Sequence, residues 1–149
     1  MSIATVAVAM AAPLALADQE LIGTAGNDTI TGSAGKDRIN GLGGDDRLFG
    51  WAGSDQIRGG AGADVIVGGK GNDVLIGETG NDVIRGGPGV DEIVGGSGKD
   101  RIFGGAGNDV IRAEYGGVDH IDCGDGVHDV AFVDAFDTVT GCEKVNVQS

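Results

Sequence analysis

Aromatic and basic residues are the side chains that this sequence has in shortest supply. Aromatic residues make up 4% of the 149 residues, which excludes a conventional core of large side chains. Lysine and arginine total 10 against 23 aspartates and glutamates, and the formal net charge is −13. A chain this acidic is a poor partner for nucleic acids and anionic membrane surfaces, and a good partner for cations.

Residues that support zinc binding or catalysis are also few. The two cysteines, Cys123 and Cys142, lack the short C-x-x-C spacing of a zinc site, and an even count in an exported chain predicts a disulfide. The two histidines, His120 and His128, lack a positioned nucleophile or acid, and no serine lies in a nucleophile-elbow sequence. We therefore predict that the protein is not an enzyme and has no catalytic or organic-cofactor site.

The first 17 residues, MSIATVAVAMAAPLALA, form an apolar run that ends in A-L-A before Asp18. The run is short for a membrane span, which needs about 20 residues. It predicts a secretory signal cleaved after Ala17, and hence a secreted, extracellular protein without a membrane span after cleavage. No lysine or arginine precedes the run, so an uncleaved anchor and a buried first strand stay as alternatives.

Glycine is abundant, with 31 residues, and it recurs at a fixed period. From Gly23 to Arg112 the chain divides into ten uninterrupted units of nine residues, beginning GTAGNDTIT, GSAGKDRIN and GLGGDDRLF. Positions 1 and 4 are glycine, position 6 is aspartate and position 8 is isoleucine or leucine in every unit. A period of this kind is typical of a solenoid.

Each repeat position has a physical role. Glycines at positions 1 and 4 allow a tight turn over positions 1–6. Positions 7–9 form a very short strand, with the aliphatic position 8 facing inward and its flanks facing outward. Two repeats then make one flat coil, and stacked coils pair their strands in parallel. The sequence predicts an all-β fold: a right-handed parallel β-roll of about five coils with two repeats in each coil.

These repeats resemble the RTX, or hemolysin-type, calcium-binding nonapeptide repeat, G-G-x-G-x-D-x-U-x, with U a large aliphatic residue. The resemblance covers Gly23–Arg112. It implies that calcium ions lie between stacked loops, held by position-6 aspartates and loop carbonyls. Half of the units lack glycine at position 2, which puts the turn geometry there in question. These units carry Thr24, Ser33, Leu42, Trp51 and Glu78.

The position-6 aspartates are the candidate calcium ligands. Those two repeats apart stack on the same edge of the roll, at about 4.8 Å spacing, where like charges repel unless cations lie between them. Ca²⁺ fits, because it takes 6–8 oxygen ligands in flexible geometry. The gaps between loops predict about eight sites. One column is Asp28, Asp46, Asp64, Asp82 and Asp100, and the other is Asp37, Asp55, Asp73, Asp91 and Asp109.

Position 5 carries Asp45 and several asparagines, which we expect to be turn formers and not ligands. The asparagines are Asn27, Asn72, Asn81 and Asn108.

After Arg112 the repeat becomes irregular. The chain therefore divides into three predicted regions: a signal at 1–17, a calcium-binding roll at 18–112, and irregular repeats with a C-terminal cap at 113–149. A solenoid needs such an end to cover its last coil. We expect a Cys123–Cys142 disulfide to pin the cap. Asp119 and Asp129 are placed to extend the two columns by one step each.

The sequence therefore predicts an exported protein that binds several Ca²⁺ ions and folds on binding them. One alternative is a calcium-stabilised adhesin or glycan-binding scaffold, although positions 7 and 9 show no regular outward array. Another is the end module of an RTX toxin, protease or epimerase. Trp51 is predicted to be exposed, either packing over a neighbouring loop or stacking on a sugar. A protein or glycan partner is not specified.

Overall fold

The computed structural model describes residues 18–148, and every secondary-structure element in this range is a strand. The predicted signal, residues 1–17, lies outside the described residues. The described residues contain no helix with the length and apolarity that crossing a membrane requires. The strands are β1 (Glu20–Ile22), β2 (Thr29–Thr31), β3 (Arg38–Gly43), β4 (Arg47–Ala52), β5 (Gln56–Ala61), β6 (Val65–Lys70), β7 (Val74–Thr79), β8 (Val83–Pro88), β9 (Glu92–Ser97), β10 (Arg101–Ala106), β11 (Val110–Ala113), β12 (His120–Asp125), β13 (Val130–Asp134), β14 (Thr138–Thr140) and β15 (Lys144–Gln148).

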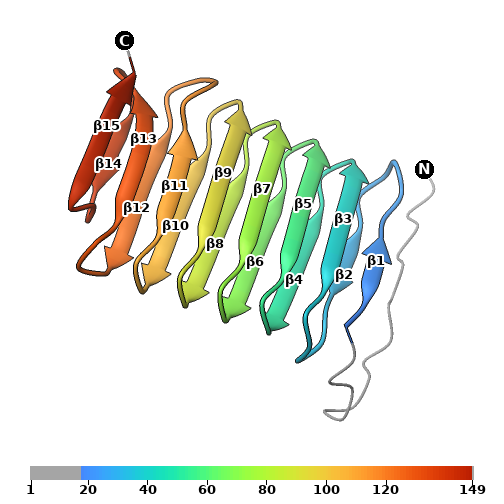
Figure 1. The fold of residues 1–149 in the computed structure, drawn as a ribbon. Helices are drawn as coiled ribbons and strands as arrows, with labels where there is room; N and C mark the ends of the chain where they lie inside the picture. Colours follow the sequence, from blue (N-terminus) through green and yellow to red (C-terminus); the bar gives the residue numbers. More distant parts are fainter. Residues whose placement is uncertain (1–17, 149) are drawn as a thin grey trace.

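The strands form two parallel sheets that face each other along the roll (Figure 1). Odd-numbered strands, from β1 to β15, make an eight-stranded sheet, here called sheet A, and even-numbered strands, from β2 to β14, make a seven-stranded sheet, sheet B. Paired residues in the regular part lie 18 positions apart, as in Leu48 and Ile66. The prediction of a parallel β-roll with two repeats per coil is therefore confirmed.

A single row of position-8 side chains from each sheet fills the interior. Each of these residues is at most 2% exposed, while the residues on either side of it point outward. The interior is thin because two short strands enclose little volume, and one aliphatic side chain per strand fills it. The repeat positions in this core are Ile30, Ile39, Leu48, Ile57, Ile66, Leu75, Ile84, Ile93, Ile102 and Ile111.

Most strands are longer than the expected triplet. From β3 to β10 each has six residues and runs from position 7 to position 3 of the next repeat. This extension requires a positive φ at position 2, which glycine supplies in half of the repeats. Leu42, Trp51 and Glu78 adopt it as well, with φ of 76°, 83° and 78°, although a left-handed conformation costs a non-glycine residue about 1–2 kcal/mol.

The roll continues beyond Arg112 to about seven coils, more than the five expected. The strands β12, β13, β14 and β15 join the same two sheets in parallel, so the C-terminal region is largely further coils. Cys123 is fully buried in the core row and forms the predicted disulfide with Cys142. The two Cα atoms are 5.1 Å apart, and the bond ties β12 to the last turn of the chain.

Candidate metal centre: two columns of buried aspartates

Each position-6 aspartate lies at the end of a turn, immediately before a strand begins. Asp64, for example, precedes β6, and Asp82 precedes β8. All of the predicted ligands are at most 2% exposed, which is unusual for a charged residue. They are Asp28, Asp37, Asp46, Asp55, Asp64, Asp73, Asp82, Asp91, Asp100, Asp109, Asp119 and Asp129.

Oδ1 of each aspartate in the regular part, except Asp28, joins a ladder along the edge of the roll, and Oδ1 of Asp28 is buried without a partner. The backbone N–H of Asp46 donates to Oδ1 of Asp64 at 2.8 Å, and the backbone N–H of Asp64 donates to Oδ1 of Asp82 at 2.8 Å. The same bond recurs on the other edge, from Asp55 to Asp73. The ladder fixes the rotamer of each carboxylate and places its second oxygen.

That second oxygen has no partner. Among the described residues, Oδ2 is buried without a hydrogen bond in ten of the aspartates: Asp46, Asp55, Asp64, Asp73, Asp82, Asp91, Asp100, Asp109, Asp119 and Asp129. Leaving a buried polar atom unpaired is costly, and more so for a charged group. A periodic row of such atoms indicates a cation as the missing partner.

The position-1 glycines show where the free oxygens lie. A methyl group built at Gly59 would contact Oδ2 of Asp64 and would lie 2.9 Å from the carbonyl oxygen of Gly77, in the next coil of the same sheet. Gly68 stands in the same relation to Asp73 and to the Gly86 carbonyl, also at 2.9 Å. A carboxylate oxygen from one coil and a backbone carbonyl from the next therefore converge beside these two glycines, where a side chain would displace them.

Burial raises the pKa of the nine column carboxyl groups from Asp46 to Asp119. The pKa values of Asp82 and Asp91 rise to about 7, chiefly through desolvation, while a backbone N–H donor opposes the rise and neighbouring aspartates of the column add to it. The pKa values of Asp46, Asp55 and Asp119 rise to about 6 for the same leading reason. Without a metal these carboxyl groups therefore bind protons at higher pH than a free aspartate does, and a divalent cation would compete with those protons.

The donor set fits calcium. In residues 18–148, no three His, Cys, Asp or Glu side chains gather into a group that could hold a metal ion. The atoms that converge beside Gly59 and Gly68 are a carboxylate oxygen and a backbone carbonyl oxygen, so the candidate donors are all oxygen atoms. Calcium accepts such a mixed set of oxygens in flexible geometry.

A family model, the RTX calcium-binding nonapeptide repeat (4 copies), matches residues 22–57, 49–84, 58–93, 85–116 and 94–126. The chain belongs to this family. The RTX repeats imply that the chain binds calcium, and the RTX β-roll is a structural calcium-binding fold. No curated protein matches the chain.

The first two RTX loops differ from the rest, because the residue at position 2 bonds the aspartate. Oδ2 of Asp28 accepts bonds from the backbone N–H of Thr24 at 2.5 Å and from its hydroxyl at 3.0 Å. Oδ2 of Asp37 accepts from the backbone N–H of Ser33 at 2.5 Å and from its hydroxyl at 3.1 Å. Neither Thr24 nor Ser33 has the positive φ of other position-2 residues. Here the sequence departure at position 2 does change the turn.

The two columns extend further than the sequence analysis predicted. Asp119 and Asp129 lie in the ladder, and their N–H groups donate to Oδ1 of Asp137 at 2.9 Å and to Oε2 of Glu143 at 2.7 Å. Asp137 and Glu143 were missed because the glycine frame is lost there. A usable signal remains: each precedes a polar–apolar–polar triplet, as position 6 does.

The position-5 residues connect coils as well as shaping turns. The backbone N–H of Asp45 donates to Oδ1 of Asn27, and that of Ala63 donates to Oδ1 of Asp45, both at 2.9 Å. Asn72 and Asn81 accept in the same way from residues one coil further along. Each of these side chains is exposed, and the ladder they form runs beside the buried aspartates.

Proposed function

We propose that the chain is an exported calcium-binding module that folds into its roll as calcium fills the gaps between stacked loops. The observation that carries the proposal is the periodic row of buried Oδ2 atoms without hydrogen-bond partners. The position-6 aspartates, with Asp119 and Asp129, are the proposed ligands, and about eight ions are expected in the regular part. The role is binding and scaffolding, not catalysis.

The loop of Asp37 is the weakest candidate for an occupied site, because both of its carboxylate oxygens accept hydrogen bonds from protein donors. Oδ2 of Asp28 accepts two hydrogen bonds from Thr24, although its Oδ1 is buried without a partner. Hydrogen-bond donors of the protein stabilise these carboxylate oxygens, as a cation is proposed to stabilise the free oxygens further along the roll. We therefore expect the N-terminal coil to need calcium less than the middle of the roll.

Export is proposed on two independent grounds. The apolar run that ends in A-L-A at residues 15–17 has the pattern of a cleavable signal. The Cys123–Cys142 disulfide is typical of an oxidising compartment. We propose residues 1–17 as the signal, 18–112 as the regular roll and 113–149 as its irregular end. N-terminal sequencing of protein from the culture medium tests the cleavage, and a first residue other than Asp18 would refute it.

Far-ultraviolet circular dichroism tests calcium-coupled folding directly. The full chain is placed in chelator and then titrated with calcium to about 10 mM, above the range of about 10⁻⁴–10⁻³ M in which extracellular modules bind. We expect a cooperative change from coil to β structure. A spectrum that is already β-rich in chelator and does not change with calcium would refute the proposal. Magnesium is the control, because it prefers a smaller octahedral site and keeps its waters.

A further inference from the structure

The two sheets differ in charge, which the net charge of the chain conceals. The strands β4, β6, β8 and β10 carry one cation each, namely Arg47, Lys70, Arg85 and Arg101, and no strand of sheet B from β2 to β10 contains an aspartate or glutamate. Sheet A from β1 to β11 has three arginines and three glutamates. Alternation of repeats between the sheets thus gathers positive charge on β4 to β10 of an acidic protein. The adjoining strand β12 carries Asp122 and Asp125, which pair with Phe103 and Ala106 of β10 and mark the acidic end of this face.

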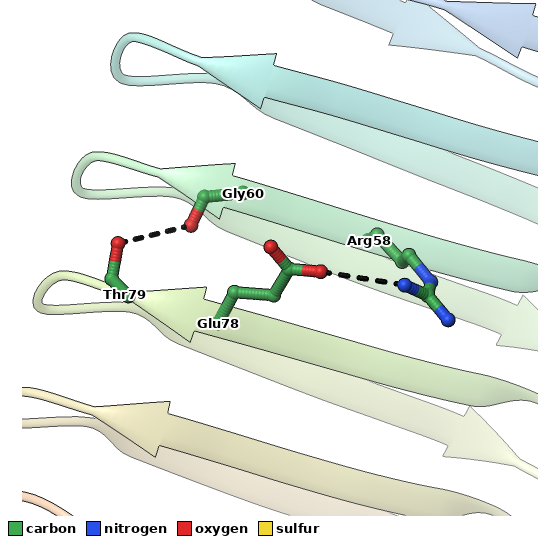
Figure 2. Close-up of polar contacts among 4 residues, drawn as sticks. All are labelled: Arg58, Gly60, Glu78 and Thr79. Atoms are coloured by element: carbon green, nitrogen blue, oxygen red, sulfur yellow. Dashed lines mark hydrogen bonds and ion pairs between the residues drawn. The ribbon is translucent and has the colours of Figure 1, made fainter.

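The arginines of sheet B have no acidic partner. Among the described residues the ion pair within 4.0 Å is Arg58 with Glu78, at 3.6 Å, and it lies on sheet A (Figure 2). On sheet B the guanidinium groups of Arg85 and Arg101 instead lie 4.4 and 5.6 Å from the centre of the Phe103 ring. Stacking of this kind orients an arginine and leaves its N–H donors free for an anion.

An exposed tryptophan lies on the same face. Trp51 is 59% exposed. Arg47, Phe49 and Trp51 alternate along β4 with the buried Leu48 and Gly50, so all three side chains point away from the core. Its partner on β6 is Gly69. The equivalent position on β8 is also a glycine, Gly87, so a flat strip of backbone lies beside the ring.

We propose that this face of sheet B binds a linear anionic polysaccharide, carboxylated or sulfated. The basic-aromatic face is defined as Arg47, Phe49, Trp51, Arg85, Arg101 and Phe103. Arginines bind carboxylate and sulfate groups through paired N–H donors. The open tryptophan ring offers a stacking surface for the apolar side of a sugar ring.

Three features favour a polysaccharide over other anionic partners. The four strands span about 14 Å along the roll at about 4.8 Å per strand, so the cations follow the axis as charges follow an extended polymer. Phe49 and Phe103 are half-buried and do not project as a membrane-inserting residue does. The glycine strip beside Trp51 leaves room for a flat ring.

The proposal rests on the proposed function, because separate strands form this face only in the folded roll. Calcium also removes an electrostatic obstacle. About eight ions carry about sixteen positive charges, which exceeds the formal net charge of −13. A loaded roll would therefore attract a polyanion that the metal-free chain repels. By linkage, the polymer must strengthen calcium binding to the same degree that calcium strengthens polymer binding.

The test uses the full chain in calcium, with folding checked by circular dichroism in each sample. Fluorescent dextran sulfate and hyaluronate are the probes, and neutral dextran is the negative control. The variant Arg47→Gln/Arg85→Gln/Arg101→Gln is compared with Arg38→Gln/Arg58→Gln/Arg112→Gln, which removes the same charge from sheet A. We expect at least a tenfold loss of affinity for the first variant, a loss below threefold for the second, and a shallower salt dependence for the first alone.

Trp51 provides a second readout, because it is the single tryptophan of the chain. Its fluorescence should change on binding of the charged polymers and not on addition of neutral dextran. Trp51→Gly keeps the positive φ of this position while removing the ring, and we expect it to lower affinity at least fivefold.

Five outcomes would overturn the proposal. Equal losses in the two triple variants would show attraction by net charge alone. Absence of polymer binding by a roll that folds in calcium would refute the face and leave the proposed function intact, whereas failure to fold in calcium would refute both. Tighter, face-dependent binding to phosphatidylserine vesicles or to polyglutamate would assign the face to a membrane or an acidic polypeptide. Equal binding of neutral dextran would remove the role of charge.

Discussion

Asp46 and Asp45 are adjacent in one loop but have opposite environments, which allows a matched test of the calcium columns. Asp46 is 1% exposed, and its Oδ2 atom has no partner among the described residues. Asp45 is exposed and takes part in the outer ladder, where asparagine is the more common residue. Asp46→Asn and Asp45→Asn are therefore the same chemical change made inside and outside the proposed site.

The structure indicates the size of the effect. Asparagine at position 46 retains an Oδ1 atom to accept the Asp28 N–H, so the ladder survives and the loss is confined to one charged oxygen donor. Bonds to charged groups are worth about 1.5–3 kcal/mol. Because 1.4 kcal/mol is about tenfold, we expect calcium affinity in the two gaps beside Asp46 to fall about 10- to 100-fold. Asp45→Asn should change it less than threefold.

The sign of the effect should reverse without calcium. Asp46→Asn removes a like charge from the column, so in chelator the variant should hold as much β structure as the unaltered chain, or more. Isothermal titration calorimetry with calcium measures the loss of two strong sites, and circular dichroism in chelator measures the reversal. Equal calorimetric behaviour of the two variants would refute the assignment of the column as the metal site.

Three further predictions follow from the same geometry. In chelator, the metal-free roll should gain β structure as the pH falls from about 7 to about 4, as measured by circular dichroism. The reason is that the pKa values of Asp82 and Asp91 are raised from 3.8 to about 7 in the folded roll, so the folded state binds protons more tightly than the unfolded state. Gly59→Ala should abolish calcium-induced folding of its coil, since the added carbon would contact Oδ2 of Asp64; hydrogen exchange along the chain measures the local loss. Leu42→Gly should stabilise the calcium-loaded roll by about 1 kcal/mol, because glycine accepts the φ of 76° without strain; thermal unfolding measures it.

Each of these predictions has an opposite result that would count against it. Loss of β structure on acidification in chelator would mean that the carboxylates are better stabilised when charged than their burial implies. Full calcium-induced protection of the coil in Gly59→Ala would mean that the free oxygen and the neighbouring carbonyl do not share a site. A lower melting temperature for Leu42→Gly would mean that the leucine side chain stabilises the turn by more than its backbone conformation costs.

The nine-residue period determined the fold and most of the candidate site. Position 8 fixed the inward row from Ile30 to Ile111, because alternation along a strand leaves one face for the single apolar side chain. Position 6 fixed the two aspartate columns, because residues 18 apart must stack when two repeats make one coil. The sequence could not predict the strand length. Glycines at positions 1 and 2 are compatible with a turn, and equally with a longer strand that contains one residue of positive φ.

Tertiary structure decided what depends on contacts between coils. The continuation of the columns to Asp137 and Glu143 requires the neighbouring coil to be in place. Charge is the clearest case. The sequence by itself sets the net charge at −13 and, through two repeats per coil, the alternation of repeats between opposite sheets. Only the structure shows that Arg47, Arg85 and Arg101 have no acidic side chain within 4.0 Å among the described residues, because ion pairing depends on side-chain rotamers and on the neighbouring coil.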